Sequence, residues 1–167
     1  MTMLVSSTLD TPVGTLTLVG GDAGLRAVLW PVDDPSRAGL DDIPAAGEHA
    51  VLAATARQLS EWFAGDRQDF DLPLDLQGTA FQREVWEALV AIPFGRTTSY
   101  GQLASELGRH GGARAVGAAV GRNPVSVVVP CHRVVGADGR LTGFAGGTDA
   151  KSFLLRHERS TTAMTLL

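Results

Sequence analysis

The chain has 167 residues, of which 44 % are hydrophobic and 19 % charged, and its mean hydropathy of +0.09 is typical of a folded protein with one large domain or two small ones. One cysteine excludes an internal disulfide, and no window approaches the roughly 18 apolar residues of a membrane span. The net charge of −4 divides unequally: residues 1–76 carry −8 and residues 77–167 carry +4, which suggests two modules. The basic module could meet a polyanion such as nucleic acid, or present a solvated surface without a partner.

The first half predicts an antiparallel sheet followed by a helix. Short apolar runs separated by turn-forming residues predict three strands, over 4–9, 16–19 and 25–30. After a loop over 31–47, apolar residues recur at helical spacing over 50–63, and Gly65 ends that helix. Residues 70–76 alternate and predict an edge strand, because Pro73 cannot donate to a neighbouring strand. No chemistry stands out in this half, and His49 is expected to be a plain surface histidine.

Helices dominate the second half, after a boundary predicted near residues 77–79. Thr79 can cap a helix whose apolar stripe ends at the sequence Ile-Pro-Phe-Gly over 92–95. Thr98 or Ser99 can cap a short helix over 100–107, and a glycine-rich turn leads to another over 113–120. Two short helices joined by a tight turn that contains glycine describe a helix-turn-helix.

The second of these helices is made almost entirely of small residues, with one long cationic side chain, Arg114. Such a slim helix could approach a nucleic-acid backbone or groove closely. It could equally pack tightly against a neighbouring helix, and the pattern leaves both interpretations open. At the end of the chain, residues 161–167 are predicted to form a flexible tail.

Cys131 is the candidate nucleophile. It follows the apolar run Val125–Val129, predicted to be a buried strand, and His132 and Arg133 come directly after it. Because the thiolate is the reactive form of cysteine, a neighbouring cation or proton acceptor favours reactivity. The alternative is a buried cysteine that acts as a small hydrophobe. A later helix over 149–158 ends in Glu158, whose carboxylate could orient an imidazole that takes the thiol proton.

A set of motifs in the second half carries a family resemblance. The motifs are Phe81-Gln82, Val85-Trp86, Ala88-Leu89, Ile92-Pro93, Gly95, Thr98-Ser99-Tyr100-Gly101, Ala113-Arg114-Ala115-Val116-Gly117, Asn123-Pro124, Pro130-Cys131-His132-Arg133-Val134, Gly143-Phe144, Gly146-Gly147, and Leu154-Leu155 before Glu158. In this order and at these spacings the chain resembles the O6-alkylguanine-DNA alkyltransferases, the methylated-DNA-protein-cysteine methyltransferases. The resemblance spans most of the chain.

The resemblance implies an α+β fold. Residues 1–76 would form an N-terminal ribonuclease-H-like α/β domain with an antiparallel sheet. Residues 77–160 would form a mainly helical, winged helix-turn-helix domain that binds DNA and carries out alkyl transfer.

The resemblance also implies direct-reversal DNA repair: the alkyl group of O6-alkylguanine would move irreversibly and stoichiometrically to Cys131 after base flipping. Activity on O4-alkylthymine is left open. The partner would be double-stranded DNA carrying alkylated guanine. We expect no membrane association, a monomer in the cytoplasm, and no cofactor. We also expect no metal, since the first half lacks the cysteine and histidine set by which some relatives hold zinc.

Catalytic roles follow from the resemblance residue by residue. Cys131 would be the alkyl acceptor, His132 its base through a bound water, and Glu158 the group that orients and polarises that histidine. Tyr100 would hydrogen-bond guanine and help to protonate it as it leaves. Asn123 would brace the turn beside the active site.

Binding roles follow in the same way. Arg114 would enter the duplex and fill the space of the extruded base, and the other residues expected to contact DNA are Ala113, Ala115, Gly117, Arg122 and Tyr100. Arg122 and Arg133 could contact phosphate or support the fold. The substrate pocket is expected to include Val134, Phe144, Ala145 and Gly146. Phe144 stands where many family members have tyrosine, so the aromatic ring is kept and a hydroxyl is absent.

Two other functions compete with this interpretation. The first is a binding protein without catalysis, like the alkyltransferase-like proteins that carry tryptophan in place of the cysteine, and Cys131 argues against it. The second is a cysteine hydrolase, which needs a distant histidine and an oxyanion hole. Here His132 is adjacent to Cys131, and no such arrangement is evident.

Overall fold

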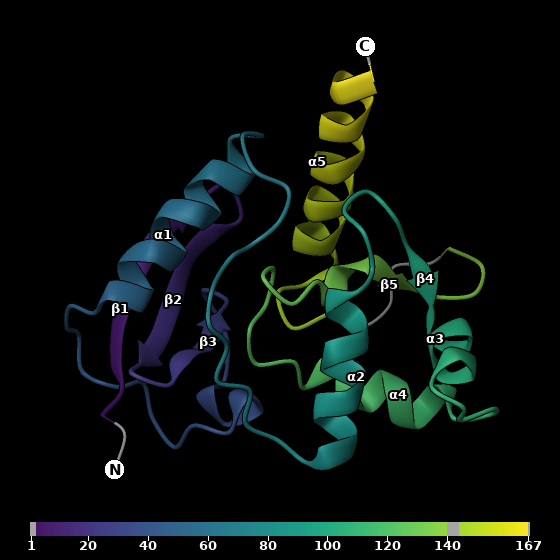
Figure 1. The fold of residues 1–167 in the computed structure, drawn as a ribbon, viewed down its shortest axis with the longest axis horizontal. Helices are drawn as coiled ribbons and strands as arrows, with labels where there is room; N and C mark the ends of the chain where they lie inside the picture. Colours follow the sequence, from purple (N-terminus) through teal and green to yellow (C-terminus); the bar gives the residue numbers. More distant parts are fainter. Residues whose placement is uncertain (1–2, 140–143, 167) are drawn as a thin grey trace. The chain divides into compact units, whose positions relative to one another are not determined.

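A computed structural model describes residues 3–139 and 144–166 (Figure 1). The chain divides into two compact units. The first comprises Met1–Gly78 with Pro124–Val128, and the second comprises Thr79–Asn123 with Val129–Leu167. The prediction of an α+β fold, with an antiparallel N-terminal sheet and a helical second part, is confirmed. None of the described helices combines the length and the apolar character needed to cross a membrane.

The first unit is a three-stranded antiparallel meander covered by one helix. Its elements are β1 (Val5–Thr11), β2 (Gly14–Gly21), β3 (Gly24–Leu29) and α1 (Ala50–Phe63). The sheet order is β1-β2-β3, and α1 lies along the sheet, as Figure 1 shows. Every residue of β3 is buried, and the side chains of Leu59 and Trp62 on α1 are fully buried, so the core of this unit lies between helix and sheet.

Two features of the first unit differ from the sequence predictions. Residues 70–76 are not a strand, because a single bridge joins Leu74 to Leu25 and the hydrogen bonds beside it run only from Leu25 N to Pro73 O (2.8 Å) and from Asp75 N to Leu25 O (2.9 Å). The predicted loop over 31–47 contains a 3₁₀ helix, η1 (Pro35–Ala38), whose first turn is capped by the carboxylate of Asp34.

His49 is not a plain surface histidine. It occupies the N-cap of α1, where its Nδ1 accepts a hydrogen bond from Val51 N at 3.1 Å. Its Nε2 lies 2.8 Å from the carboxylate of Asp22. The imidazole therefore replaces the hydroxyl or carboxylate that usually satisfies a free N–H at a helix start.

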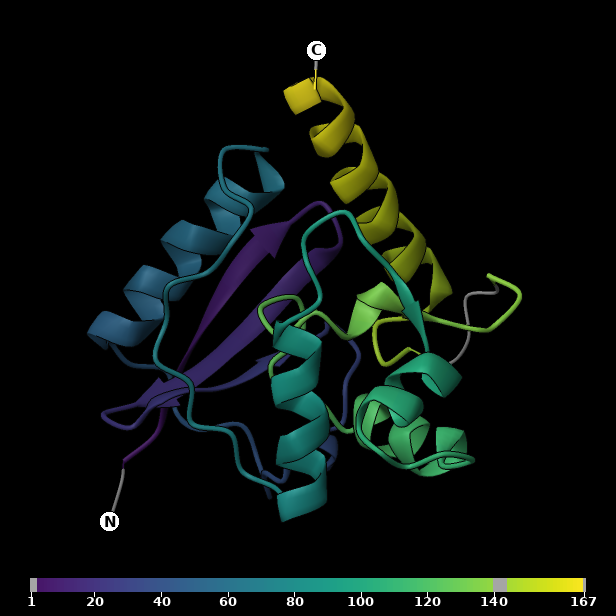
Figure 2. The same cartoon turned by 45° about the vertical axis from the view of Figure 1, so that its right-hand side comes forward.

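The second unit is mainly helical. Its elements are α2 (Ala80–Val90), β4 (Thr98–Ser99), α3 (Tyr100–Glu106), α4 (Ala113–Gly121), η2 (Cys131–Arg133), β5 (Val134–Val135) and α5 (Thr148–Leu166). α4 packs against both α2 and α3 (Figure 2), and Trp86 Nε1 of α2 donates to Ala119 O at 2.8 Å. Thr79 and Gln82 form a reciprocal capping box at the start of α2, and Ser99 caps α3. The parallel pair β4–β5 was not predicted.

The segment that precedes the cysteine is buried, as predicted, but it is not a strand. Only Val125 forms a bridge, to Val28, after which the chain curls through a hydrogen bond from Val128 N to Ser126 O (2.9 Å). Val127 has a positive φ of 70°, which is rare for a β-branched residue. A strand needs a partner along its whole length, and a run of valines alone shows only that the segment avoids water.

The C-terminal helix is longer than predicted. α5 continues past Ser160 to Leu166, so residues 161–166 of the predicted flexible tail are helical, and Leu167 lies outside the described residues. Thr162 Oγ1 donates to Glu158 O at 2.8 Å, and a Cβ on Gly95 would approach that hydroxyl to 2.6 Å. The last turns of α5 therefore begin against the loop that contains Gly95.

Candidate active site

Cys131 is the first residue of η2, directly after Pro130. It forms no disulfide, only 6 % of the residue is exposed, and its N–H donates to Val129 O at 2.8 Å. The turn thus fixes the cysteine backbone at a buried position. The element that carries it is in contact with α5.

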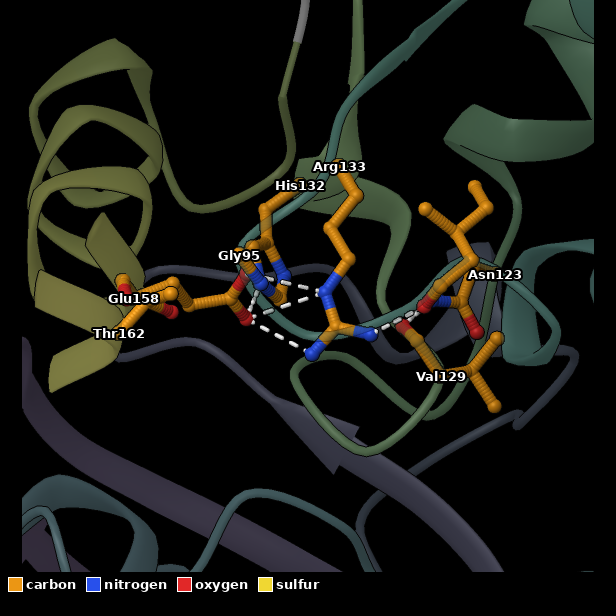
Figure 3. A network of polar contacts seen from close by, with 8 residues as sticks. Gly95, Asn123, Val129, His132, Arg133, Glu158 and Thr162 are labelled. Atoms are coloured by element: carbon orange, nitrogen blue, oxygen red, sulfur yellow. Dashed lines mark hydrogen bonds and ion pairs between the residues drawn. The ribbon is translucent and has the colours of Figure 1, made fainter. Parts of the chain in front are cut away.

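The carboxylate of Glu158 is the centre of a buried polar network (Figure 3). Its Oε2 lies 2.7 Å from His132 Nε2 and accepts a hydrogen bond from Arg133 Nη2 at 2.8 Å. Its Oε1 accepts hydrogen bonds from Arg133 Nε at 3.0 Å and from Gly95 N at 3.1 Å. The side chains of His132 and Glu158 have almost no exposed surface, so their charges interact in a largely desolvated environment.

The charges in this network have a clear physical origin. Burial alone would raise the pKa of Glu158, but hydrogen bonds from His132 and Arg133 outweigh it and hold that pKa at about 2. Burial lowers the pKa of His132, although Glu158 opposes that shift. At neutral pH the carboxylate is therefore ionised and the imidazole neutral. Because the ionised Glu158 only accepts, Nε2 of His132 carries the proton and Nδ1 is the acceptor of the ring.

Arg133 supports the fold and does not face solvent. Only 5 % of it is exposed, Nη1 donates to Ile92 O, and its guanidinium lies 5.6 Å from the centre of the Phe94 ring. Together with the bonds to Glu158, these contacts hold the guanidinium on three sides. Of the two roles left open for Arg133, the structure therefore supports a role in the fold and not in phosphate binding.

Asn123 joins the two ends of the segment that precedes the cysteine. The chain leaves the second unit after Asn123 and returns to it at Val129, and Asn123 Nδ2 donates to Val129 O at 2.8 Å (Figure 3). Asn123 is 1 % exposed. This bond and the one from Cys131 N share the same carbonyl oxygen, so Asn123 helps to fix the residue from which the cysteine turn begins.

Lys151 is a functional candidate that the sequence analysis missed. It lies on α5, is 1 % exposed, and places Nζ 6.0 Å from the centre of the Tyr100 ring and 5.7 Å from that of Phe144. Burial lowers the pKa of Lys151, whereas the negative charge of Cys131 raises it. Lys151 thus links Cys131, Tyr100 and Phe144. The sequence offered one sign that Lys151 is unusual: it is the only lysine among the 14 lysine and arginine residues of the chain.

The residues of α4 predicted to contact DNA divide by exposure. Arg114, Ala115 and Arg122 are exposed, whereas Ala113 and Gly117 are partly buried. The opposite side of the helix is buried by Val116, Ala119 and Val120. A Cβ on Gly117 would lie 3.5 Å from Tyr100 Cδ1, an ordinary van der Waals distance, so the Tyr100 ring packs against this part of the helix. Small residues therefore serve both packing and an open outer surface.

The predicted pocket residues lie on two segments. Val134 belongs to β5, where it pairs with Thr98 and has no exposed surface. Phe144, Ala145 and Gly146 form the turn before α5, which is closed by a hydrogen bond from Gly147 N to Phe144 O at 2.9 Å. Gly143 lies outside the described residues. Within residues 3–139 and 144–166, no three His, Cys, Asp or Glu residues are grouped as a metal site would require.

The fold and the site together define a class of protein. It has a buried cysteine next in sequence to the histidine of a histidine–carboxylate pair, in a unit that contains two short helices joined by a glycine turn. Comparison with known families agrees. Residues 80–160 match the family described as 6-O-methylguanine DNA methyltransferase, DNA binding domain. Residues 4–76 match the ribonuclease-like domain of the same methyltransferase.

Individual relatives are similar over nearly their whole length. A methylated-DNA--protein-cysteine methyltransferase of Mycolicibacterium paratuberculosis is 49 % identical over 160 residues, which cover 94 % of this chain and 93 % of that protein. The protein of that name from Shigella flexneri is 46 % identical over 166 residues, covering 95 % and 97 %. A crystal structure of Mycobacterium tuberculosis OGT in complex with DNA is 44 % identical, covers 92 % of each chain and has a TM-score of 0.83. The chain belongs to the 6-O-methylguanine DNA methyltransferase family.

Proposed function

We propose that this chain repairs DNA by direct reversal, as a methylated-DNA–protein-cysteine methyltransferase that accepts the alkyl group of O6-alkylguanine on Cys131. The observation that carries the proposal is the buried cysteine turn joined directly to the His132–Glu158 pair, in a chain of this family. In the transfer, the Cys131 sulfur forms a bond to the alkyl carbon while the bond from that carbon to guanine O6 breaks. The electron pair of the broken bond stays on guanine O6. Because the thioether on Cys131 is not reversed, each molecule acts once.

His132 is the base in this proposal. Its Nδ1, the acceptor of the neutral ring, takes the thiol proton through a bound water, and Glu158 stabilises the imidazolium that forms. The depressed pKa of Glu158 supports this role, because an ionised carboxylate is in place before the reaction begins. The buried ammonium of Lys151 supplies positive charge that favours the thiolate.

Tyr100 and Arg114 act on the guanine. An alkylated base stacked in a duplex cannot reach a buried sulfur, so it must be flipped out at a cost of a few kcal/mol. Arg114, exposed on α4, fills the space that the base leaves, and its planar guanidinium can stack and hydrogen-bond there. Tyr100 hydrogen-bonds the flipped guanine and helps to protonate it as it leaves. Asn123 keeps the cysteine turn fixed during the reaction.

The remaining binding surface is proposed on the same basis. Ala113, Ala115 and Gly117 let α4 approach the duplex closely, and Arg122 at its C-cap contacts a phosphate. Phe144, Ala145 and Gly146 receive the base, with Val134 behind them. Activity on O4-alkylthymine, a monomeric state and a cytoplasmic location stay predictions.

Mass spectrometry of the intact protein tests the proposal. After incubation with a duplex that contains one O6-methylguanine, we expect a mass increase of one methyl group, located on Cys131 by peptide mapping. The Cys131→Ser variant should bind the same duplex without any increase. A wild-type protein that binds the duplex and stays unmodified would instead favour a binding protein without catalysis.

A further inference from the structure

A cavity of about 300 Å³ lies within the second unit, beside the carboxylate of Glu158. It is lined by the loop Gly95–Thr97, by β5 and the turn at Gly139, and by Leu155, Glu158 and Arg159 of α5. None of Cys131, Tyr100, Phe144 or the residues of α4 lines it. Its volume is at the lower end of the range for small-molecule sites, so a ligand of a few heavy atoms fits it.

The cavity carries uncompensated positive charge. Arg96 and Arg159 line it from different segments, and in the part of the chain that the structure describes neither guanidinium forms an ion pair. Glu158 is the acidic residue of the lining, but its charge is already balanced by Arg133, which donates to both of its oxygens. Two guanidinium groups at one cavity therefore give its lining a positive charge that an anionic ligand would complement.

We propose that this cavity binds a small phosphoanion, such as pyrophosphate or the phosphate group of a free nucleotide. Arginine suits this ligand, because its planar fork of N–H groups donates two parallel hydrogen bonds to phosphate oxygens. The hydroxyl of Thr97, on the same loop as Arg96, is an additional donor at the lining. The inference goes beyond the proposed repair function and does not depend on it.

A free anion fits this position better than a phosphate of the DNA backbone. The residues proposed to meet DNA belong to α3 and α4, and the cavity is formed without either helix. The ligand is therefore expected to bind whether or not DNA is present.

Titration of the full-length protein with pyrophosphate tests the proposal, by calorimetry and by ¹⁵N NMR of the Gly95 amide and the arginine Nε groups. We expect saturable binding of one pyrophosphate, with shifts at Gly95, Arg96 and Arg159. Arg96→Gln and Arg159→Gln should each weaken binding about tenfold. Arg156→Gln is the matched control, because Arg156 is an exposed arginine on the same helix that does not line the cavity.

Because both arginines are exposed, their substitution should leave the fold intact, which circular dichroism and the thermal midpoint verify. Three outcomes would overturn the proposal. These are the absence of saturable binding, equal loss of affinity in all three variants, and displacement of pyrophosphate by a short unmodified duplex. The last outcome would assign the arginines to DNA contact.

Discussion

The carboxylate of Glu158, on α5, accepts hydrogen bonds from two other segments of the second unit: the loop at Gly95, and the cysteine turn through His132 and Arg133. Its folded pKa of about 2 lies below the ordinary value of 4.5. The carboxylate therefore contributes stability that is complete above pH 4.5 and is lost as the pH falls toward 2. The same carboxylate therefore both orients His132 and stabilises the fold.

We expect Glu158→Gln to lower the free energy of unfolding at pH 7 by on the order of 2–3 kcal/mol, since the pKa shift and the loss of the partner of Arg133 act together. The difference from wild type should shrink as the pH falls from 4.5, because protonation removes the same charge in the wild-type protein. Urea denaturation between pH 3 and pH 7 measures it. Glu84→Gln, which alters an exposed pair with Arg109, should change stability by less than about 0.5 kcal/mol, and a constant difference across the pH range would contradict the assignment.

Lys151 is expected to act on the thiol by charge. The interaction with Cys131 that raises the pKa of Lys151 must, by reciprocity, favour the thiolate. Lys151→Met should therefore slow reaction with a free alkylguanine base at neutral pH, with recovery of the rate at higher pH, where the thiol ionises without help. The rate against pH decides: a uniform loss at every pH would point to packing against Tyr100 and Phe144 instead.

The reactive residues of the site could be predicted from the sequence, but the residues that pack around them could not. Cys131, His132 and Glu158 could be named because each carries a reactive group inside a recognisable motif. The buried positions of Lys151 and Arg133 could not, because a basic residue on a helix or after a turn faces solvent in most sequences of that pattern. Their directions are set by tertiary contacts: Arg133 bonds to Glu158 and to Ile92 O, and Lys151 lies near the Tyr100 and Phe144 rings.

At the scale of whole elements, α4 presents Arg114 on an open side and buries Val116, Ala119 and Val120 on the other. Arg114→Ala should slow repair of duplex DNA by at least tenfold more than reaction with a free alkylguanine base, because only the duplex requires flipping. Single-turnover rates on both substrates measure the ratio. Arg83→Ala, an exposed arginine on α2, is the control and should alter neither rate. Equal losses on both substrates in Arg114→Ala would reject the flipping role.

Helices were predicted more accurately than strands, for a physical reason. The periodicity and caps of α1, α2 and α3 are local, and Thr79 and Ser99 mark where α2 and α3 begin. A strand is defined by hydrogen bonds to another segment, which the sequence does not contain. Residues 70–76 and 125–129 therefore have the composition of strands and form only single bridges.

For the whole molecule, the uneven charge predicts salt-dependent DNA binding. Residues 77–167 carry a net charge of +4 while residues 1–76 carry −8, so affinity for a duplex should come from local contacts of the second unit and not from net attraction. The logarithm of the binding constant should fall linearly with the logarithm of salt concentration. Arg122→Ala should reduce that slope by about one, as loss of one phosphate contact requires, and an unchanged slope would remove Arg122 from the interface.

The position of α5 in the chain determines the order in which the residues of the site are synthesised. Cys131 and His132 are made before Lys151 and Glu158, and every other described element precedes α5. A nascent chain that has reached only residue 147 therefore holds a thiol without its cation and an imidazole without its carboxylate. The cysteine turn therefore gains both Lys151 and Glu158 only when α5 packs against it.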